Sequence, residues 1–296
     1  MKKRLFAIVA CALAMCALSA ADKGTSFIIK DGTSLWSLKG KTMTWVSSQS
    51  IGSQLVSAAN GTVKGTYKDA EYDLVKVKTD ANEEGYVFES SIARNAKGLA
   101  VVTNTLATVY SQPKDTSVLS TIIPLMNIIA VWEVPGKPDF LQFSCYAGDT
   151  GTYISEKYIL ASDISQGDSD VNTALLLQAI KAQPKKEQKQ KTLQILVKKY
   201  PVSSFSALVA ELNAAFTPQN IPSEEFNASL TASDTVNIRD IPSVYGSVIV
   251  ALKKGDKITS VLKTIASYTI GDKTGKWLKI SAPKEGWVFD AYFTAD

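Results

Sequence analysis

Few residues in this 296-residue chain could do chemistry, because it contains no histidine. Histidine is the commonest general base and metal ligand, so its absence excludes Ser-His-Asp and Cys-His catalysis and histidine zinc sites. Two adjacent acidic pairs remain, Glu83-Glu84 and Glu224-Glu225, since a glycosidase needs only two carboxylates across a cleft. Both pairs lie in loop-like sequence, without apolar neighbours that would raise a carboxyl pKa. We therefore predict no catalytic residue, no metal site and no cofactor, and we expect that the protein is not an enzyme.

The cysteines are the remaining candidates for nucleophilic or metal chemistry. Cys11 and Cys16 lie near the N-terminus, and Cys145 lies in a strand-like run of alternating apolar residues. A single cysteine beyond the N-terminal segment cannot form an intramolecular disulfide or a structural zinc site. We predict that Cys145 is a buried, small apolar residue.

The first 21 residues have the pattern of a secretory signal peptide. Lys2, Lys3 and Arg4 precede an uncharged apolar run from 5 to 18, and Ser19-Ala20-Ala21 supplies small residues for cleavage. A second interpretation is a lipoprotein signal with lipidation at Cys16. The chain is therefore expected to be exported to the periplasm or cell envelope, and to associate with a membrane only if Cys16 is lipidated.

The overall charge gives no indication of a nucleic-acid partner. The 32 Lys and Arg residues exceed the 28 Asp and Glu residues by four, and three of these positive residues lie in the predicted signal peptide. The remaining charge is about +1, which is too small to attract nucleic acid through bulk electrostatics. We expect no nucleic-acid binding.

The elements that must position these residues are mostly short strands. Runs rich in Val, Ile, Thr and aromatic residues are broken by Gly, Asn, Asp and Pro, which is typical of small all-β modules. One stretch differs: residues 169–216 lack Gly and have helical spacing, which predicts three short helices ending near Pro184, Tyr200 and Phe216.

An internal repeat links the two ends of the chain. Glu84-Gly85-Tyr86-Val87-Phe88-Glu89 recurs as Glu285-Gly286-Trp287-Val288-Phe289-Asp290, and a strand-like run precedes each copy. A looser third copy joins Phe140-Leu141-Gln142-Phe143 to Tyr153-Ile154. The repeat predicts three related β modules.

The C-terminal copy resembles the bacterial SH3 (SH3b) family in the order and spacing of five blocks. These blocks are Val236 to Pro242, Gly246 to Ile249, Leu252 to Ile258, Trp277 to Ile280 and Gly286 to Val288. The resemblance implies a mainly β chain of tandem small SH3-like β-barrels, with a three-helix segment inserted before the last barrel. The expected parts are a signal peptide (1–21), SH3-like modules at 25–95 and 98–161, a helical segment at 165–220 and the C-terminal module at 228–296.

Aromatic side chains are the expected binding residues, because Trp and Tyr offer large contact area and a polar tip. Trp287 is expected in the core, and Trp132 is a further candidate for binding in the middle module. The predicted ligand-binding residues are Tyr245, Trp277, Tyr292, Arg239 and Tyr110.

These observations together favour a non-catalytic exported envelope protein whose modules bind cell-wall peptides or envelope proteins. The expected partner is a peptidoglycan peptide or an envelope protein. In the alternative, the protein is an envelope scaffold that binds its partner through an exposed apolar stripe of Phe205, Leu208 and Leu212. A carboxylate-based cell-wall hydrolase is a third hypothesis.

Overall fold

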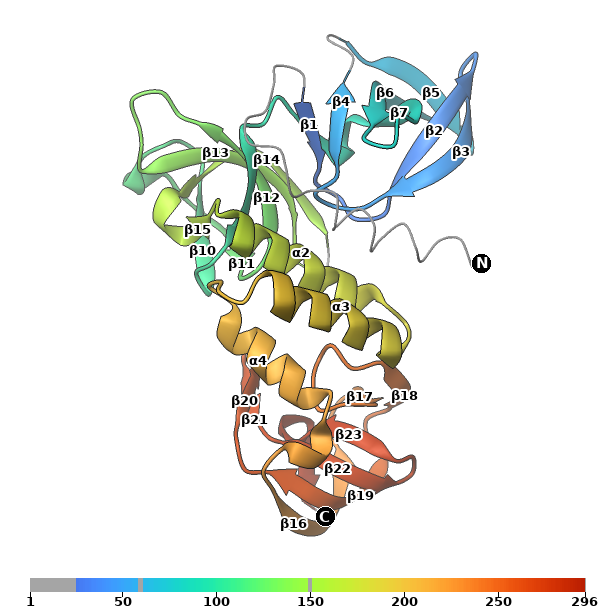
Figure 1. Cartoon of the computed structure of the whole chain (residues 1–296), viewed down its shortest axis with the longest axis vertical. Helices are drawn as coiled ribbons and strands as arrows, with labels where there is room; N and C mark the ends of the chain where they lie inside the picture. The colour runs from blue at the N-terminus through green and yellow to red at the C-terminus, as the bar shows by residue number, and fades with distance from the viewer. Residues whose placement is uncertain (1–24, 58–60, 149–150, 296) are drawn as a thin grey trace. The chain divides into compact units, whose positions relative to one another are not determined.

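The computed structural model describes residues 25–57, 61–148 and 151–295 (Figure 1). The predicted signal peptide and Cys16 lie outside these described residues. Within the described part, the chain divides into two compact units, unit 1 up to Leu175 and unit 2 from Leu176.

Unit 1 contains two antiparallel-rich sheets. The strands of the first sheet are β1 (Thr25–Ile28), β2 (Thr33–Lys39), β3 (Thr42–Gln49), β4 (Gln54–Ser57), β5 (Val63–Tyr67), β6 (Ala70–Thr79), β7 (Glu84–Phe88) and β8 (Ile92–Arg94). The strands of the second are β9 (Gly98–Val102), β10 (Leu106–Tyr110), β11 (Val118–Pro124), β12 (Ile128–Glu133), β13 (Phe140–Ala147), β14 (Thr152–Leu160) and β15 (Ile164–Ser165). Three short 3-10 turns accompany them: η1 (Glu89–Ser91), η2 (Asp115–Ser117) and η3 (Ala161–Asp163).

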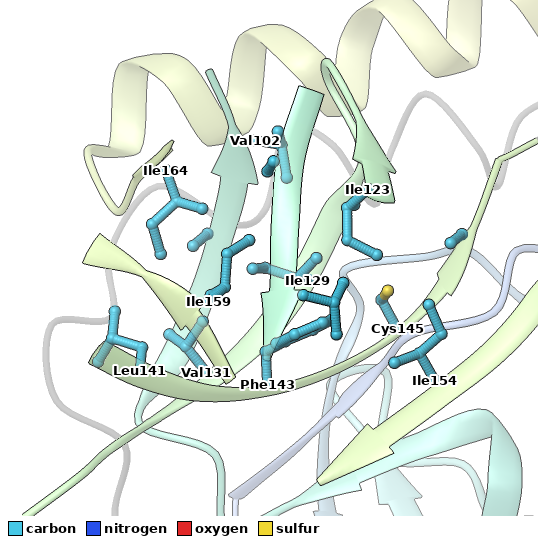
Figure 2. Close-up of a cluster of buried hydrophobic side chains, with 14 residues drawn as sticks. Val102, Ile123, Ile129, Val131, Leu141, Phe143, Cys145, Ile154, Ile159 and Ile164 are labelled. Carbon is cyan, nitrogen blue, oxygen red and sulfur yellow. The ribbon is translucent and has the colours of Figure 1, made fainter. Parts of the chain in front are cut away.

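Period-2 alternation explains why these segments form strands with one buried face. In β6, Val75 and Val77 are buried, whereas Lys76 and Lys78 are exposed. The buried side chains of the second sheet form one cluster, in which Phe143 and Ile129 are fully buried. Figure 2 shows these side chains, drawn from several strands, pointing into one cluster.

Three α-helices follow in the described chain: α2 (Asp168–Ala182), α3 (Lys186–Lys199) and α4 (Ser206–Ala215). Acidic residues open α2 at Asp168 and Asp170, and Lys198 and Lys199 close α3, so both helices carry charges that favour their dipoles. Pro184 and Pro201 lie just beyond the ends of α2 and α3. The three predicted helices are confirmed.

The third sheet lies in unit 2. Its strands are β16 (Ser223–Ala232), β17 (Val236–Arg239), β18 (Val248–Leu252), β19 (Lys257–Thr264), β22 (Trp277–Ala282), β23 (Gly286–Phe289) and β24 (Phe293–Ala295). A separate hairpin joins β20 (Tyr268–Ile270) to β21 (Lys273–Gly275), and the short turns are η4 (Pro218–Asn220) and η5 (Asp290–Tyr292).

The three sheets share one order of strands. From edge to edge they run β3-β2-β7-β6-β4-β1-β8, β11-β10-β14-β13-β12-β9-β15 and β18-β17-β23-β22-β19-β16-β24, and the first sheet adds β5 beside β3. The two closest copies of the sequence repeat form β7 and β23, and each leads into a 3-10 turn and the edge strand that follows. A mainly β chain with a short helical segment before the last sheet is confirmed.

Two local expectations are wrong. Phe205 and Leu212 are buried and Leu208 is half-buried, so the stripe expected to be exposed on the third helix is packed away. Glu84 begins β7, and Glu224 and Glu225 lie on β16, so these carboxylates are exposed on strands and not in loops.

Candidate functional site

The binding residues predicted in unit 2 lie mostly in its interior. Trp277 is 3% exposed and packs edge-on against Phe289, with ring centroids 5.5 Å apart. Tyr292 is half-buried, and the Lys273 ammonium lies 4.9 Å from its ring. These side chains offer little free surface to a ligand, and their role in binding stays a prediction. Trp287 is buried in the same aromatic cluster, as predicted.

Tyr245 and Arg239 meet at the loop that precedes β18. The Arg239 guanidinium donates to the Gly246 carbonyl at 2.7 Å, and the buried Lys189 ammonium of α3 donates to the Tyr245 carbonyl at 2.5 Å. Burial raises the pKa of the Tyr245 phenol to about 12 and lowers the pKa of Arg239. The structure brings these two predicted residues together in a packed loop that α3 supports.

Tyr110 is the one predicted ligand-binding residue in unit 1, on β10. It is buried and packs edge-on against Phe140, with ring centroids 5.2 Å apart. Burial also raises the pKa of its phenol.

Cys145 is buried within the core of the second sheet. Its sulfur points into the apolar cluster beside Ile154, as Figure 2 shows. Burial raises the pKa of its thiol to about 12, so the thiolate needed for nucleophilic attack does not form near neutral pH. The predicted packing role is confirmed. The described residues also contain no cluster of three or more Cys, Asp or Glu side chains that could hold a metal ion.

A groove of about 930 Å³ lies in unit 1 and is lined by both of its sheets. The first sheet contributes residues from β6, β7, η1 and β8, and the second contributes residues from β12, β13 and β14. A volume of this size lies in the range of sites that hold small ligands. It is therefore the candidate functional site in unit 1.

Direct contacts between the two sheets hold the groove walls together. The Trp132 indole N–H of β12 donates to the Arg94 carbonyl of β8 at 3.2 Å. An apolar cluster from both sheets lies behind this bond and contains Ile29, Ala93, Ala96 and Ala130, with Trp132 and Tyr146 packed against it.

Aromatic rings form part of both walls. On the first sheet, Tyr72 packs on Phe88 with ring centroids 4.8 Å apart. On the second sheet, Tyr153 is 44% exposed and packs on Tyr146, with ring centroids 5.1 Å apart. Trp132 also lines this wall. Such rings supply contact area at low conformational cost.

Both signs of charge line the groove. Lys30 and Arg94 are the cations, and the carboxylates are Glu71, Asp73, Glu89 and Glu156. The Arg94 guanidinium donates to Glu89 at 2.6 Å, while its buried Nε has no partner among the described residues. The groove can therefore bind a ligand that carries opposite charges.

Sequence reasoning missed nearly all of this groove, although it named Trp132 as a candidate for binding. The other lining residues come from segments separated by up to about half of the chain, and no motif marks them. A possible signal was the concentration of Tyr and charged residues at 71–73 and 153–156, in and beside the copies of the repeat.

Comparisons with known proteins give few matches. No family model matches the chain, and no curated protein matches it.

No helix in the described part combines the length and apolar character needed to cross a membrane.

Several solved structures show distant similarity. Ly7917, solved with the hydrolyzing product of MDP, is 13% identical, with 71% of this chain and 76% of that chain covered and a TM-score of 0.23. An NlpC/P60 endopeptidase from Photobacterium damselae subsp. piscicida is 10% identical, with coverage of 92% and 66% and a TM-score of 0.23. NlpC2 from Trichomonas vaginalis is 10% identical, with coverage of 93% and 100% and a TM-score of 0.19.

These neighbours contradict the prediction of a non-catalytic envelope protein that is not an enzyme. One is named an endopeptidase, and another was solved with a product of hydrolysis. That prediction is withdrawn. Since all three TM-scores are 0.23 or lower, the neighbours transfer neither a fold nor a reaction to this chain.

Proposed function

We propose that this protein works in peptidoglycan turnover at the bacterial envelope, and that the groove of unit 1 holds a short wall peptide. The observation that carries the proposal is the composition of the groove, which combines one exposed and three half-buried aromatic rings with side chains of both charges. Peptides of the bacterial wall are short and carry free carboxylates and amines. Charged groups fix the orientation of such a peptide, while aromatic faces cover its aliphatic parts.

The proposed location follows from the N-terminal sequence. Residues 1–21 direct export in this proposal, and either cleavage near Ala21 or lipidation at Cys16 completes it. The resemblance of residues 230–295 to SH3b modules supports the same location.

The residues limit the chemistry that this chain could bring to wall turnover. It has no histidine, and Cys145 is buried with a pKa of about 12. A Cys–His endopeptidase reaction would therefore need residues that this sequence does not contain. The carboxylates of the groove are the groups that this chain can itself present to a bound peptide.

The proposal is tested by incubating the full chain with purified peptidoglycan sacculi and measuring two quantities. The first is the protein retained on the sacculi after a high-salt wash, and the second is the release of soluble muropeptides. We expect retention that falls at least threefold in Tyr153→Ala, which removes an exposed ring from the groove wall.

Trp45→Ala is the matched control, because Trp45 is also 44% exposed and lies in unit 1 outside the groove lining. It should be retained like the unmodified protein. If the unmodified protein is not retained and releases no muropeptides, the proposal is wrong. If both variants lose retention equally, the groove is not the site.

A further inference from the structure

Two of the charged groove residues lack an ion-pair partner among the described residues, and they have opposite signs. Lys30 and Glu156 are both exposed and form no salt bridge there. The other carboxylates of the groove each have a cation within 4.0 Å: Lys64 lies near Glu71 and Asp73, Lys41 lies near Glu71, and Arg94 lies near Glu89. Lys30 and Glu156 are thus the groove charges left for a ligand.

A pair of tyrosines, Tyr146 and Tyr153, packs together beside Lys30 and belongs to the same sheet as Glu156. The Lys30 ammonium lies 5.0 Å from the centre of the Tyr146 ring, and Tyr146 packs on Tyr153. Tyr153 and Glu156 lie three residues apart on β14 and both line the groove, and the Glu156 carboxylate adds to the effect of burial in raising the pKa of the Tyr153 phenol. The groove thus combines a cation that follows β1 with an aromatic surface and a carboxylate of the second sheet.

The backbone at Glu156 adds an independent indication. Its φ is +53°, although it lies inside β14 and is not a glycine. The pairing of β13 with β14 shifts register there, and the Glu156 amide donates to the Ser144 hydroxyl at 3.3 Å. Bulges redirect side chains and are frequent beside binding sites, and a strained residue persists where its surroundings hold it in place.

We infer that Lys30 and Glu156 bind the two oppositely charged groups of a zwitterionic peptide. Lys30 binds a free carboxylate, and Glu156 binds a free ammonium group. The Tyr146–Tyr153 pair covers the chain between them. This inference rests on the proposed function, since it names the chemical features by which the groove selects its peptide.

The test uses a synthetic tripeptide with a free C-terminal carboxylate and a free side-chain amine, titrated calorimetrically into the full chain. Two capped forms are compared with it, one acetylated on the amine and one amidated at the C-terminus. Each cap should weaken binding by about fivefold in the unmodified protein, as expected for one partly exposed ion pair.

The variants then assign each charge to its residue. Glu156→Gln should bind the free and the acetylated peptide equally, and Lys30→Met should bind the free and the amidated peptide equally. Glu156→Gly should behave like Glu156→Gln while relieving the backbone strain, which separates loss of the carboxylate from loss of folding. The controls Lys78→Met and Asp139→Asn remove exposed charges of unit 1 outside the groove and should keep both fivefold effects.

The outcomes separate this inference from the function on which it rests. If the unmodified protein binds all three peptides equally, the charge reading is wrong while wall-peptide binding stands. If the variants keep the sensitivity that they should lose, the assignment to Lys30 and Glu156 is wrong. If neither the peptides nor the sacculi bind, the proposed function fails, and this inference fails with it.

Discussion

At the scale of single residues, Glu156 has a backbone conformation that its side chain disfavours. A φ of +53° costs an ordinary residue about 1 kcal/mol relative to glycine. We predict that Glu156→Gly is more stable than Glu156→Ala by about 1 kcal/mol in urea denaturation. Equal stability of the two variants would show that the left-handed conformation at this position carries no strain.

A second prediction concerns the Cys145 thiol. Because it is buried and its pKa is raised to about 12, it should resist alkylation by iodoacetamide at pH 8 in the folded protein and react once the protein is unfolded in guanidinium. Mass spectrometry of the peptide that contains Cys145 measures this. An exposed cysteine introduced by Ser90→Cys is the control and should react in the folded state. Rapid alkylation of folded Cys145 would contradict its placement in the core.

The burial of single residues could be predicted from sequence only where a local pattern marks it. The Gly286-Trp287-Val288 motif was enough to place Trp287 in a core, and a strand-like run was enough for Cys145. Neither kind of signal exists for the loop of Tyr245, which α3 supports through a bond from Lys189 to the Tyr245 carbonyl across 56 residues of sequence. Contacts of that separation leave no local pattern.

At the scale of elements, the glycine of the repeat has the same physical role in both copies. A Cβ on Gly85 would lie 2.9 Å from the Trp36 carbonyl oxygen, and a Cβ on Gly286 would lie 2.9 Å from the Arg239 carbonyl oxygen. In each case the neighbouring strand approaches too closely for a side chain.

We therefore predict that Gly85→Ala destabilises the protein by about 2 kcal/mol, because the added methyl group would overpack the contact between β7 and β2. Gly98→Ala is the matched control in the same unit, since a Cβ there meets nothing within 4 Å. Thermal denaturation of both variants measures the difference. If Gly85→Ala melts like Gly98→Ala, the close approach does not explain the repeated glycine.

The attachment of α3 to the loop before β18 gives a further prediction. Lys189→Met leaves the Tyr245 carbonyl without its lysine donor, so the amides of residues 240–247 should exchange with deuterium faster. Lys191→Met, on an exposed position of the same helix, should leave this exchange unchanged. Unchanged exchange in Lys189→Met would mean that the loop does not depend on this bond.

The elements themselves were largely predictable from sequence. Helical spacing and two prolines were enough for α2, α3 and α4, and the repeat identified the strand pairs that include β7 and β23. Of Gly255, Gly271 and Gly275 in the last module, two lie at turns with positive φ. Gly255 and Gly271 have φ of +92° and +63°, whereas Gly275 lies within β21, where a Cβ would contact Asp290.

At the scale of the whole molecule, three sheets with one strand order form a chain whose candidate site belongs to no single repeat. Its walls come from the first two sheets, joined by Trp132 and the apolar cluster behind it. The sequence could predict the copies, because each copy has its own periodicity. It could not predict the groove, because packing between copies decides which side chains face one another.

In the proposed function, a wall peptide occupies the groove of unit 1. The most direct measurement is photo-crosslinking of a wall-type peptide to the full chain, with the attachment sites mapped by mass spectrometry. We predict cross-links within residues 88–94 and 142–156, suppressed by an excess of unlabelled peptide and reduced in Tyr153→Ala. Cross-links confined to residues 176–296, or none that the unlabelled peptide suppresses, would contradict the account.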